Sequence, residues 1–457
     1  MAIVTNPIVK TKNPKIYFMK HQPLFLLALS FFLSCSSFSQ IAIIPKPNDI
    51  KITEGTCSLK KSVNFKVIRG DEATKSIQKQ IADFLSQRNI AVSTTAATTL
   101  SINLLQNKTG DTIIADAYTL SITTNNIAIT SRTNAGLFYG FQSLYQLINT
   151  DTLNVVHCLE IKDQPLLSFR GFELDVCQHF FKTDVIKKYI DAISKLKLNQ
   201  FTWKLADEQA WRISTKNAAK LLDTDSTENE FYTQDEIKQV VQYAKERFIN
   251  VIPEINFAKV IQSEDTSFQF KKNILDEVFA LFPSKYFNVD EPLFVTDEIA
   301  AYIKSTGRKI ISKDAATSKG DVVLSFKNTS VGINAARNGI EVIMAPHNLC
   351  SLDNYQDWDD SKLSKSMLYL PLDKVYKFNA VAKSKQHIIG SQANINTKFI
   401  ATETKLSQQV YPRIFALAET FWTSKNNRKS FKDFSVRLEK IGYPGQITEK
   451  INLVKFK

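Results

Sequence analysis

The chain has 457 residues and a formal net charge of +13 at pH 7, which is enough length for two sizeable hydrophobic cores. Its composition is that of a globular protein, without the bias that marks long disordered segments. The basic residues are scattered and do not form runs interleaved with aromatic residues, so we expect a lysine-rich solvated surface and no nucleic-acid partner.

A signal peptide is predicted over residues 1–39. Residues 23–34, PLFLLALSFFLS, form an apolar run of the length of a signal-peptide core, too short to span a membrane. Small residues follow it and suit cleavage before Gln40. The sequence therefore predicts export to the periplasm or the cell exterior, with no membrane-spanning segment. Lipid attachment at Cys35 is the alternative.

Four cysteines follow the predicted signal peptide. In a chain of this length they do not form a disulfide framework, and no Cys/His spacing typical of a metal site is present. We expect isolated buried thiols, with one bridge as the alternative, and neither a structural metal nor a cofactor. The four are Cys57, Cys158, Cys177 and Cys350.

Residues 40–163 are predicted to form a smaller α/β domain. Apolar residues in 76–87 share one helical face, and residues 135–148 form a second, strongly apolar helix that would cover a sheet. A short strand is expected over 125–131, after an Asn-Asn turn. Pro165 breaks the pattern, which places the domain boundary between residues 163 and 164.

From residue 164 onward, short apolar strands alternate with helical segments, which is typical of parallel β/α architecture. A helix is expected over 184–197, and the capping box Thr233–Glu236 opens another that runs towards Phe248. Eight strands predict a (β/α)8 TIM barrel over residues 164–457, so the fold class is α/β. The strand segments are 169–176, 200–205, 250–255, 285–289, 309–312, 322–326, 341–345 and 387–395.

Acidic residues gather at the predicted carboxyl ends of these strands, where a TIM barrel keeps its functional residues. Carboxylates, an arginine and aromatic rings in a concave mouth suit sugars, because they bind hydroxyl groups and stack on pyranose rings. Glycoside hydrolysis needs an acid of raised pKa and a second group that stabilises an oxocarbenium-like state. The candidates are Asp175, Asp207, Glu208, Glu254, Asp290, Glu291 and Asp353, joined by Arg170, His179, Trp203 and Trp211.

Each candidate has a structural alternative. Arg170 and Asp175 could form an ion pair, and His179 could satisfy core polar groups. Trp211, like Trp203, could be a packing residue. The acidic pair 290–291 could be the start of a helix.

The stretch FRGFELDVCQHFFKTDVIKKYIDAISKLKLNQFTWKLADEQAWRI resembles the family 20 glycoside hydrolases, the β-N-acetylhexosaminidases. The likeness extends through YTQDEIKQVVQYAKERFINVIPEI and YPRIFALAETFW, and IIPKP and GLFYGFQSLYQLI resemble the N-terminal domain of that family. The resemblance implies a substrate-assisted retaining mechanism, in which the 2-acetamido oxygen of the sugar attacks the anomeric carbon. The implied partner is an N-acetylhexosamine-containing glycan.

By this resemblance Asp290 orients the acetamido group and Glu291 is the catalytic acid/base. The family motif resembles FHIGGDEV, whereas this chain reads FNVDEPL. A gapped alignment keeps the two acids as the catalytic pair on a strand end two residues shorter, and an ungapped alignment puts them at the Gly-Gly positions. The implied substrate-binding residues are Arg170, Asp175, His179, Asp207, Trp211 and Asp353.

Several positions depart from the family pattern. Together they remove tryptophans that line the sugar pocket in the family and the hydroxyl donor to the acetamido oxygen. They also add cations that would favour an anionic sugar. Losing one such donor costs roughly 10²–10³ in rate. We therefore expect a weak or inactive homologue, with an active exo-β-N-acetylhexosaminidase as the alternative. The resemblance implies that Gln178 replaces an arginine, Thr202 and Lys204 replace histidines, and Asn256 replaces an aspartate. It further implies that Lys313, Phe326 and Asn396 replace tryptophans, Ser351 replaces the tyrosine that binds the acetamido oxygen, and Lys398 replaces a sugar-binding glutamate.

Overall fold

The computed structural model describes most of the chain beyond Gln40. The predicted signal peptide lies outside the described residues, and so do Asp290 and Glu291. No helix in the described part of the chain is long and apolar enough to cross a membrane. The described residues are 41–106, 114–150, 153–217, 222, 230–257, 267–289, 295–314, 321–356, 368–381 and 386–443.

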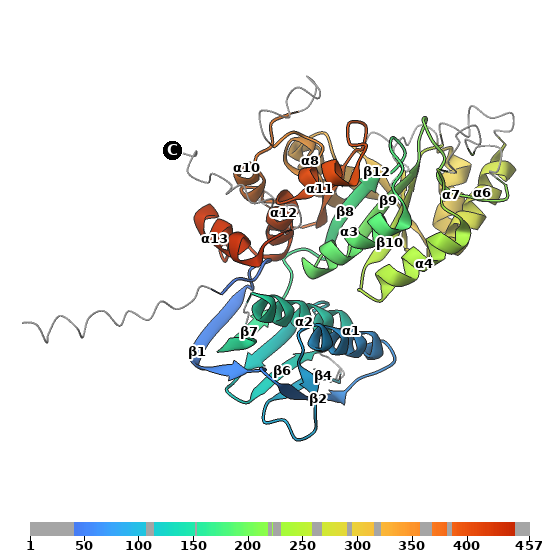
Figure 1. Ribbon diagram of the computed structural model, residues 1–457. Coiled ribbons are helices and arrows are strands. Elements are labelled where there is room, and N and C mark those ends of the chain that lie inside the picture. The colour runs from blue at the N-terminus through green and yellow to red at the C-terminus, as the bar shows by residue number, and fades with distance from the viewer. Residues whose placement is uncertain are drawn as a thin grey trace, which may run out of the picture. The chain divides into compact units, whose positions relative to one another are not determined.

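The first domain is a seven-stranded mixed sheet in the order β1-β7-β5-β6-β4-β2-β3. Helices α1 (Thr74–Gln87) and α2 (Asn134–Asn149) pack on one face of it, as their apolar faces predict (Figure 1). The strands are β1 (Asp49–Ser58), β2 (Ser62–Arg69), β3 (Ala91–Val92), β4 (Thr99–Leu104), β5 (Tyr118–Ile122), β6 (Asn126–Ser131) and β7 (Val155–Asp163).

The second domain is a closed barrel of eight parallel strands, β8 to β15 in chain order. This confirms the predicted fold class, and each of the eight predicted segments forms one barrel strand. The strands are β8 (Phe169–Asp175), β9 (Gln200–Ala206), β10 (Asn250–Ile255), β11 (Tyr286–Val289), β12 (Lys309–Lys313), β13 (Val322–Ser325), β14 (Glu341–Met344) and β15 (Ile388–Ile395).

Helices pack around the barrel, and side-chain caps open several of them, for example at Thr233, Ser267 and Ser430. The capping box at Thr233 and Glu236 is formed, but its helix ends at Lys245, three residues before the predicted Phe248. The helices are α3 (Thr183–Lys195), α4 (Gln234–Lys245), α6 (Phe268–Leu281), α7 (Asp297–Ser305), α8 (Thr329–Arg337), α9 (His347–Cys350), α10 (Leu372–Tyr376), α11 (Glu403–Val410), α12 (Arg413–Trp422) and α13 (Phe431–Ile441).

The barrel closes between β15 and β8, where Gly390 lies opposite Phe169. A Cβ atom at position 390 would overlap the carbonyl group of Phe169. Replacing Gly390 by alanine is therefore expected to lower the free energy of unfolding by about 1–3 kcal/mol, because the two strands must separate. Urea denaturation of the wild type and of Gly390→Ala measures this loss of stability. An unchanged urea midpoint would contradict the close approach of β15 to β8 at this position.

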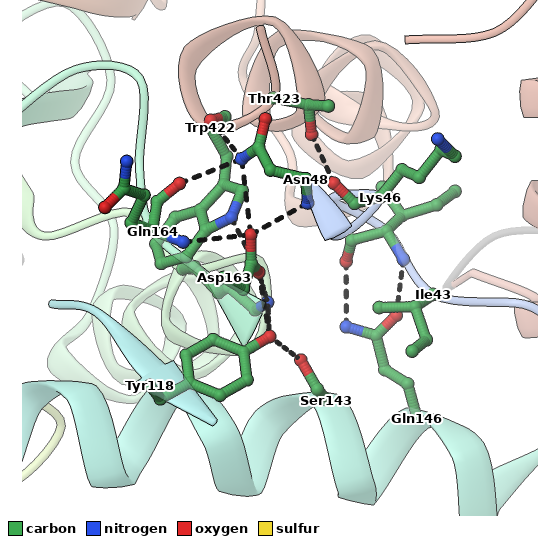
Figure 2. A network of polar contacts seen from close by, with 12 residues as sticks. Ile43, Lys46, Asn48, Tyr118, Ser143, Gln146, Asp163, Gln164, Trp422 and Thr423 are labelled. Atoms are coloured by element: carbon green, nitrogen blue, oxygen red, sulfur yellow. Dashed lines mark hydrogen bonds and ion pairs between the residues drawn. The ribbon is translucent and has the colours of Figure 1, made fainter. Parts of the chain in front are cut away.

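The two domains meet at a buried polar junction around Asp163, the last residue of β7 (Figure 2). Its Oδ2 accepts hydrogen bonds from the Tyr118 hydroxyl at 2.8 Å and from Trp422 Nε1 at 2.9 Å, and its Oδ1 accepts one from the Asn48 backbone at 2.9 Å. The fully buried Lys197 ammonium lies 3.2 Å from Asp163 Oδ2 and donates to the Tyr118 hydroxyl at 2.8 Å. One carboxylate thus links β5 and β7 to the barrel.

Candidate functional site at the barrel mouth

The carboxyl ends of four neighbouring barrel strands present one row of polar side chains. Asp175 on β8 lies beside Lys204 on β9, which lies beside Glu254 on β10, which lies beside Asn288 on β11. All four are buried, and side-chain contacts join Asp175 to Lys204 and Glu254 to Asn288. Since successive side chains of a strand point to opposite faces of the sheet, Trp203, which precedes Lys204, points away from the barrel interior. Along this row the side chains are in turn an acid, an ammonium group, an acid and an amide.

Lys204 provides the positive charge between two acids. Its Nζ lies 3.4 Å from Asp175 Oδ2 and 3.9 Å from Asp207 Oδ2. Asn396 Nδ2 donates to Asp175 Oδ2 at 2.9 Å, and Gln178 Nε2 donates to Asp207 Oδ2 at 3.2 Å. Three residues that depart from the family pattern therefore bind the same two carboxylates.

The environment of this group disfavours the ionised forms of Asp175 and Cys177. Burial raises the pKa of Asp175, and the Lys204 ammonium and the backbone N–H of Cys177 offset only part of that effect. Burial, together with Asp175 and Asp207, raises the pKa of the Cys177 thiol well above its usual value.

Asp175, Cys177 and Asp207 offer ligand atoms that all lie within 4.8 Å of one another. A protonated thiol is a poor metal ligand, however, because the thiolate is the binding form. The Lys204 ammonium already supplies positive charge to both acids. The arrangement is therefore that of an internal ion-pair cluster.

Glu254 is the centre of a second group, on β10 to β12. Its side chain is fully buried, and its Oε2 accepts a hydrogen bond of 2.5 Å from Asn288 Nδ2. Lys313 Nζ lies 3.9 Å from Glu254 Oε1 and 5.0 Å from the ring centre of Phe326, a cation–π distance. Lys313, for which the sequence resemblance implies a pocket tryptophan in the family, is thus directed towards an acid.

His179 and Asp353 both contact the segment that follows β15. The Nδ1 atom of His179 lies 2.7 Å from the carbonyl oxygen of Thr397, and its backbone N–H donates to the Thr397 hydroxyl at 3.1 Å. Burial raises the pKa of Asp353, and the effect is partly offset by backbone N–H groups, including that of Asn396, and by His347. Both candidates lie at the same end of the barrel as Asp175.

Arg170, in contrast, lies near the amino end of β8, five residues and roughly 16 Å of extended chain from Asp175. Its Nη2 lies 3.0 Å from Asp116 Oδ2, and its Nε donates to the Lys197 carbonyl at 2.7 Å. Its guanidinium stacks over Trp422 at 4.9 Å. This placement in the domain junction does not support the predicted role in binding sugar hydroxyls, nor the alternative ion pair with Asp175.

Trp211 and Trp203 are buried packing residues. Trp203 lies against Tyr232, with ring centres 4.6 Å apart. Trp211 is 2% exposed, and its Nε1 donates to the Ile213 carbonyl at 2.9 Å. A tryptophan this buried offers no face to a sugar, so the structure favours the packing alternative over the predicted substrate contact of Trp211.

The catalytic candidates Asp290 and Glu291 lie outside the described residues. Strand β11 ends at Val289, directly before them. Their catalytic roles therefore stay predictions, and the choice between the two alignments stays open.

The described residues thus form a TIM barrel with buried carboxylates at the carboxyl ends of its strands, preceded by a mixed-sheet domain. The family model "Glycosyl hydrolase family 20, catalytic domain" matches residues 167–259 and 291–425. The model "Glycosyl hydrolase family 20, domain 2" matches residues 40–164. The chain belongs to glycoside hydrolase family 20.

Relatives and solved structures agree with this assignment. The chain is 28% identical to a beta-hexosaminidase of Porphyromonas gingivalis over 87% of its own length and 62% of that protein's, and 25% identical to a beta-hexosaminidase of Vibrio furnissii over 83% and 76%. Its fold is similar to that of the Streptomyces plicatus N-acetyl-beta-hexosaminidase in complex with Thio-NAglucal, with a TM-score of 0.75, 21% identity, and coverage of 88% of this chain and 94% of the other. The beta-N-acetylhexosaminidase of Bacteroides fragilis gives a TM-score of 0.73 and 24% identity, covering 88% and 96%.

Proposed function

We propose that this protein binds hexosamine-containing glycans at its barrel mouth and hydrolyses them weakly or not at all. The observation that carries this proposal is the Lys204 ammonium, which lies within 4 Å of both Asp175 and Asp207. Catalytic acids and dipoles must be arranged for charge that develops in the transition state. Carboxylates already engaged by an internal ammonium and by Asn396 and Gln178 are less available to a sugar.

The position of Ser351 also supports weak catalysis. It stands where the family has the tyrosine that binds the acetamido oxygen, and its side chain is 1% exposed. Its hydroxyl is buried without a hydrogen-bond partner among the described residues. A serine hydroxyl in this position is held inside the protein and does not replace the longer tyrosine donor.

The second candidate function is an active exo-β-N-acetylhexosaminidase that uses Asp290 and Glu291. The names of the relatives favour it, since the Porphyromonas gingivalis and Vibrio furnissii proteins are beta-hexosaminidases. Substrate-assisted retaining hydrolysis would then proceed at a mouth in which Asp175, Asp207 and Glu254 lie within 4 Å of lysine ammonium groups.

Turnover of a chromogenic β-N-acetylglucosaminide by the wild type and by Glu291→Gln separates the two functions. We expect the wild-type rate to lie at least roughly 10²-fold below that of the Streptomyces plicatus enzyme, because a donor to the developing charge is missing. The substitution is expected to leave this residual rate unchanged. A measurable rate that Glu291→Gln abolishes would establish the active enzyme instead. Calorimetric binding of chitobiose without turnover would support the glycan-binding function.

We also propose that the mature protein is exported after removal of residues 1–39. The apolar run of residues 23–34 supports this. Amino-terminal sequencing of the exported protein is expected to begin at Gln40, whereas a lipid-modified Cys35 at the amino terminus would replace this proposal with the lipoprotein alternative.

A further inference from the structure

We propose that a cavity among the outer helices of the barrel, separate from the mouth, binds a neutral sugar unit. The cavity has a volume of about 480 Å³ and is lined by α2, α3, α11, α12 and the end of α13. This volume lies within the roughly 300–1,000 Å³ of small-molecule sites. None of the described residues that line it belongs to the mouth groups around Asp175 and Glu254. The cavity is therefore a second site, beyond the function proposed for the mouth.

Two buried tyrosines direct their polar ends to this cavity. Tyr189 on α3 is 6% exposed, Tyr411 between α11 and α12 is 8% exposed, and both line the cavity. Neither hydroxyl has a hydrogen-bond partner among the described residues. Burial raises the pKa of Tyr189, and Tyr411 and Glu403, which also line the cavity, raise it further, so these side chains lie close together. A ligand that bonds to both hydroxyls would relieve the cost of leaving them unpaired.

The two phenols match a ligand that carries hydroxyl groups. Burial raises the pKa of Tyr411 to about 12 and also raises that of Tyr189, so both phenols are protonated at pH 7. A protonated phenol has one donor and can also accept. A sugar hydroxyl likewise donates and accepts, so it can pair with either phenol in either direction. An apolar ligand would leave both phenols without a partner in the complex.

The charged side chains of the cavity favour a neutral ligand, because each is already engaged by the protein. Lys188 Nζ donates to Glu403 at 2.9 Å, and Arg247 Nε donates to Asp191 Oδ1 at 2.5 Å. The Lys195 ammonium lies 5.3 Å from the centre of an aromatic ring on α2, a cation–π distance. An ionic ligand would have to displace one of these contacts. The charged residues that line the cavity are Lys188, Asp191, Lys195 and Glu403.

The walls between these polar groups suit the carbon faces of a sugar ring. Val185, Leu196 and Phe415 line the cavity with apolar surface. The rings of Tyr411 and Tyr443 are stacked, with centres 6.4 Å apart and planes at 22°. Aromatic and aliphatic surface packs well against the C–H groups of a pyranose. Hydroxyl-binding phenols, engaged charges and apolar walls together match a neutral pyranose unit.

The test is calorimetric titration of the full chain with chitobiose, a neutral disaccharide. We expect two binding events, one at the mouth and one at the cavity. The double variant Tyr189→Phe/Tyr411→Phe removes both hydroxyls and is expected to weaken the cavity event at least about tenfold. Its urea midpoint is expected not to fall, because neither hydroxyl has a partner within the described protein. Tyr286→Phe is the matched control, since Tyr286 on β11 is also 8% exposed but lies outside the cavity.

Ser407→Trp provides an independent variant, because Ser407 lines the cavity from α11 and a tryptophan there would fill it. It is expected to remove the same binding event as the double variant. The glucosamine dimer, which is cationic at pH 6, is expected to give no event that either cavity variant weakens. Such an event would overturn the neutral ligand class.

The outcomes separate this cavity from the mouth. A single event that both cavity variants leave unchanged overturns the cavity site and leaves the glycan-binding function of the mouth intact. A single event that the cavity variants weaken supports the cavity site and overturns binding at the mouth. An equal effect of Tyr286→Phe and the double variant overturns the cavity site. Absence of any binding overturns both sites.

Discussion

Replacing Lys197 by methionine is expected to lower the free energy of unfolding by about 3–5 kcal/mol, the range for removal of one partner of a buried ion pair. The ammonium and the Asp163 carboxylate are both fully buried and 3.2 Å apart. Burial lowers the pKa of Lys197 to about 8, because attraction to Asp163 offsets only part of the cost of desolvation. The ammonium is nevertheless the main form at pH 7, and its loss removes the ion-pair partner of the buried Asp163 carboxyl group.

Urea denaturation at pH 7 measures this effect. Lys188→Met is the matched control, because Lys188 pairs with Glu403 on an exposed surface, and such pairs contribute about 0–1 kcal/mol. The double variant Lys197→Met/Asp163→Asn removes both charges and is expected to recover a substantial part of the loss. Equal stability of Lys197→Met and Lys188→Met would show that the junction does not depend on this ion pair.

Replacing Lys204 by methionine is expected to make stability strongly dependent on pH. The pKa of Asp175 is already raised in the folded protein, so the folded state binds more protons than the unfolded state between the two pKa values. Stability therefore falls as pH rises through that window. Loss of the Lys204 ammonium raises the pKa of Asp175 further, which extends the window upward. We expect a loss of about 3 kcal/mol at pH 8 and a smaller loss at pH 5.

Thermal and urea unfolding at pH 5 and pH 8 test this. Lys398→Met, at an exposed lysine after β15, is the matched control for removal of a mouth cation. Adding Asp175→Asn to Lys204→Met is expected to remove most of the extra pH dependence, because the acid that titrates is gone. An equal loss at both pH values in Lys204→Met would contradict the coupling between Lys204 and the two carboxylates.

The eight barrel strands could be predicted because each is a short apolar run bounded by polar segments, a pattern that depends on local sequence alone. The row of polar side chains from Asp175 to Asn288 could not be predicted from the sequence. It depends on which residues lie side by side on neighbouring strands, and that register is set by the closure of the barrel. The sequence resemblance marks Lys204 as a departure, but the contact of Lys204 with Asp175 joins residues 29 positions apart. The contact of Asn396 with Asp175 joins residues 221 positions apart.

Arg170 and Trp211 show a different limit of predicting site residues from the sequence. Family motifs assign residue types to a site, but they do not give the direction of each side chain in a particular chain. Arg170 is the second residue of β8 and is directed to the domain junction by Asp116 and the Trp422 ring. Trp211 follows β9 as predicted, but the backbone carbonyl of Ile213 satisfies its indole N–H and holds the ring in the core. Both outcomes depend on tertiary contacts.

The shared partners of Lys204, Asn396 and Gln178 also constrain how this mouth can evolve. Each of the three binds Asp175 or Asp207. Changing any one of them alters the charge or the hydrogen bonding around a carboxylate that another of the three also contacts. The effect of each substitution therefore depends on which of the others is present, so the three positions are epistatic. The consequence of regaining one family residue at this mouth is thus set by the two that remain changed.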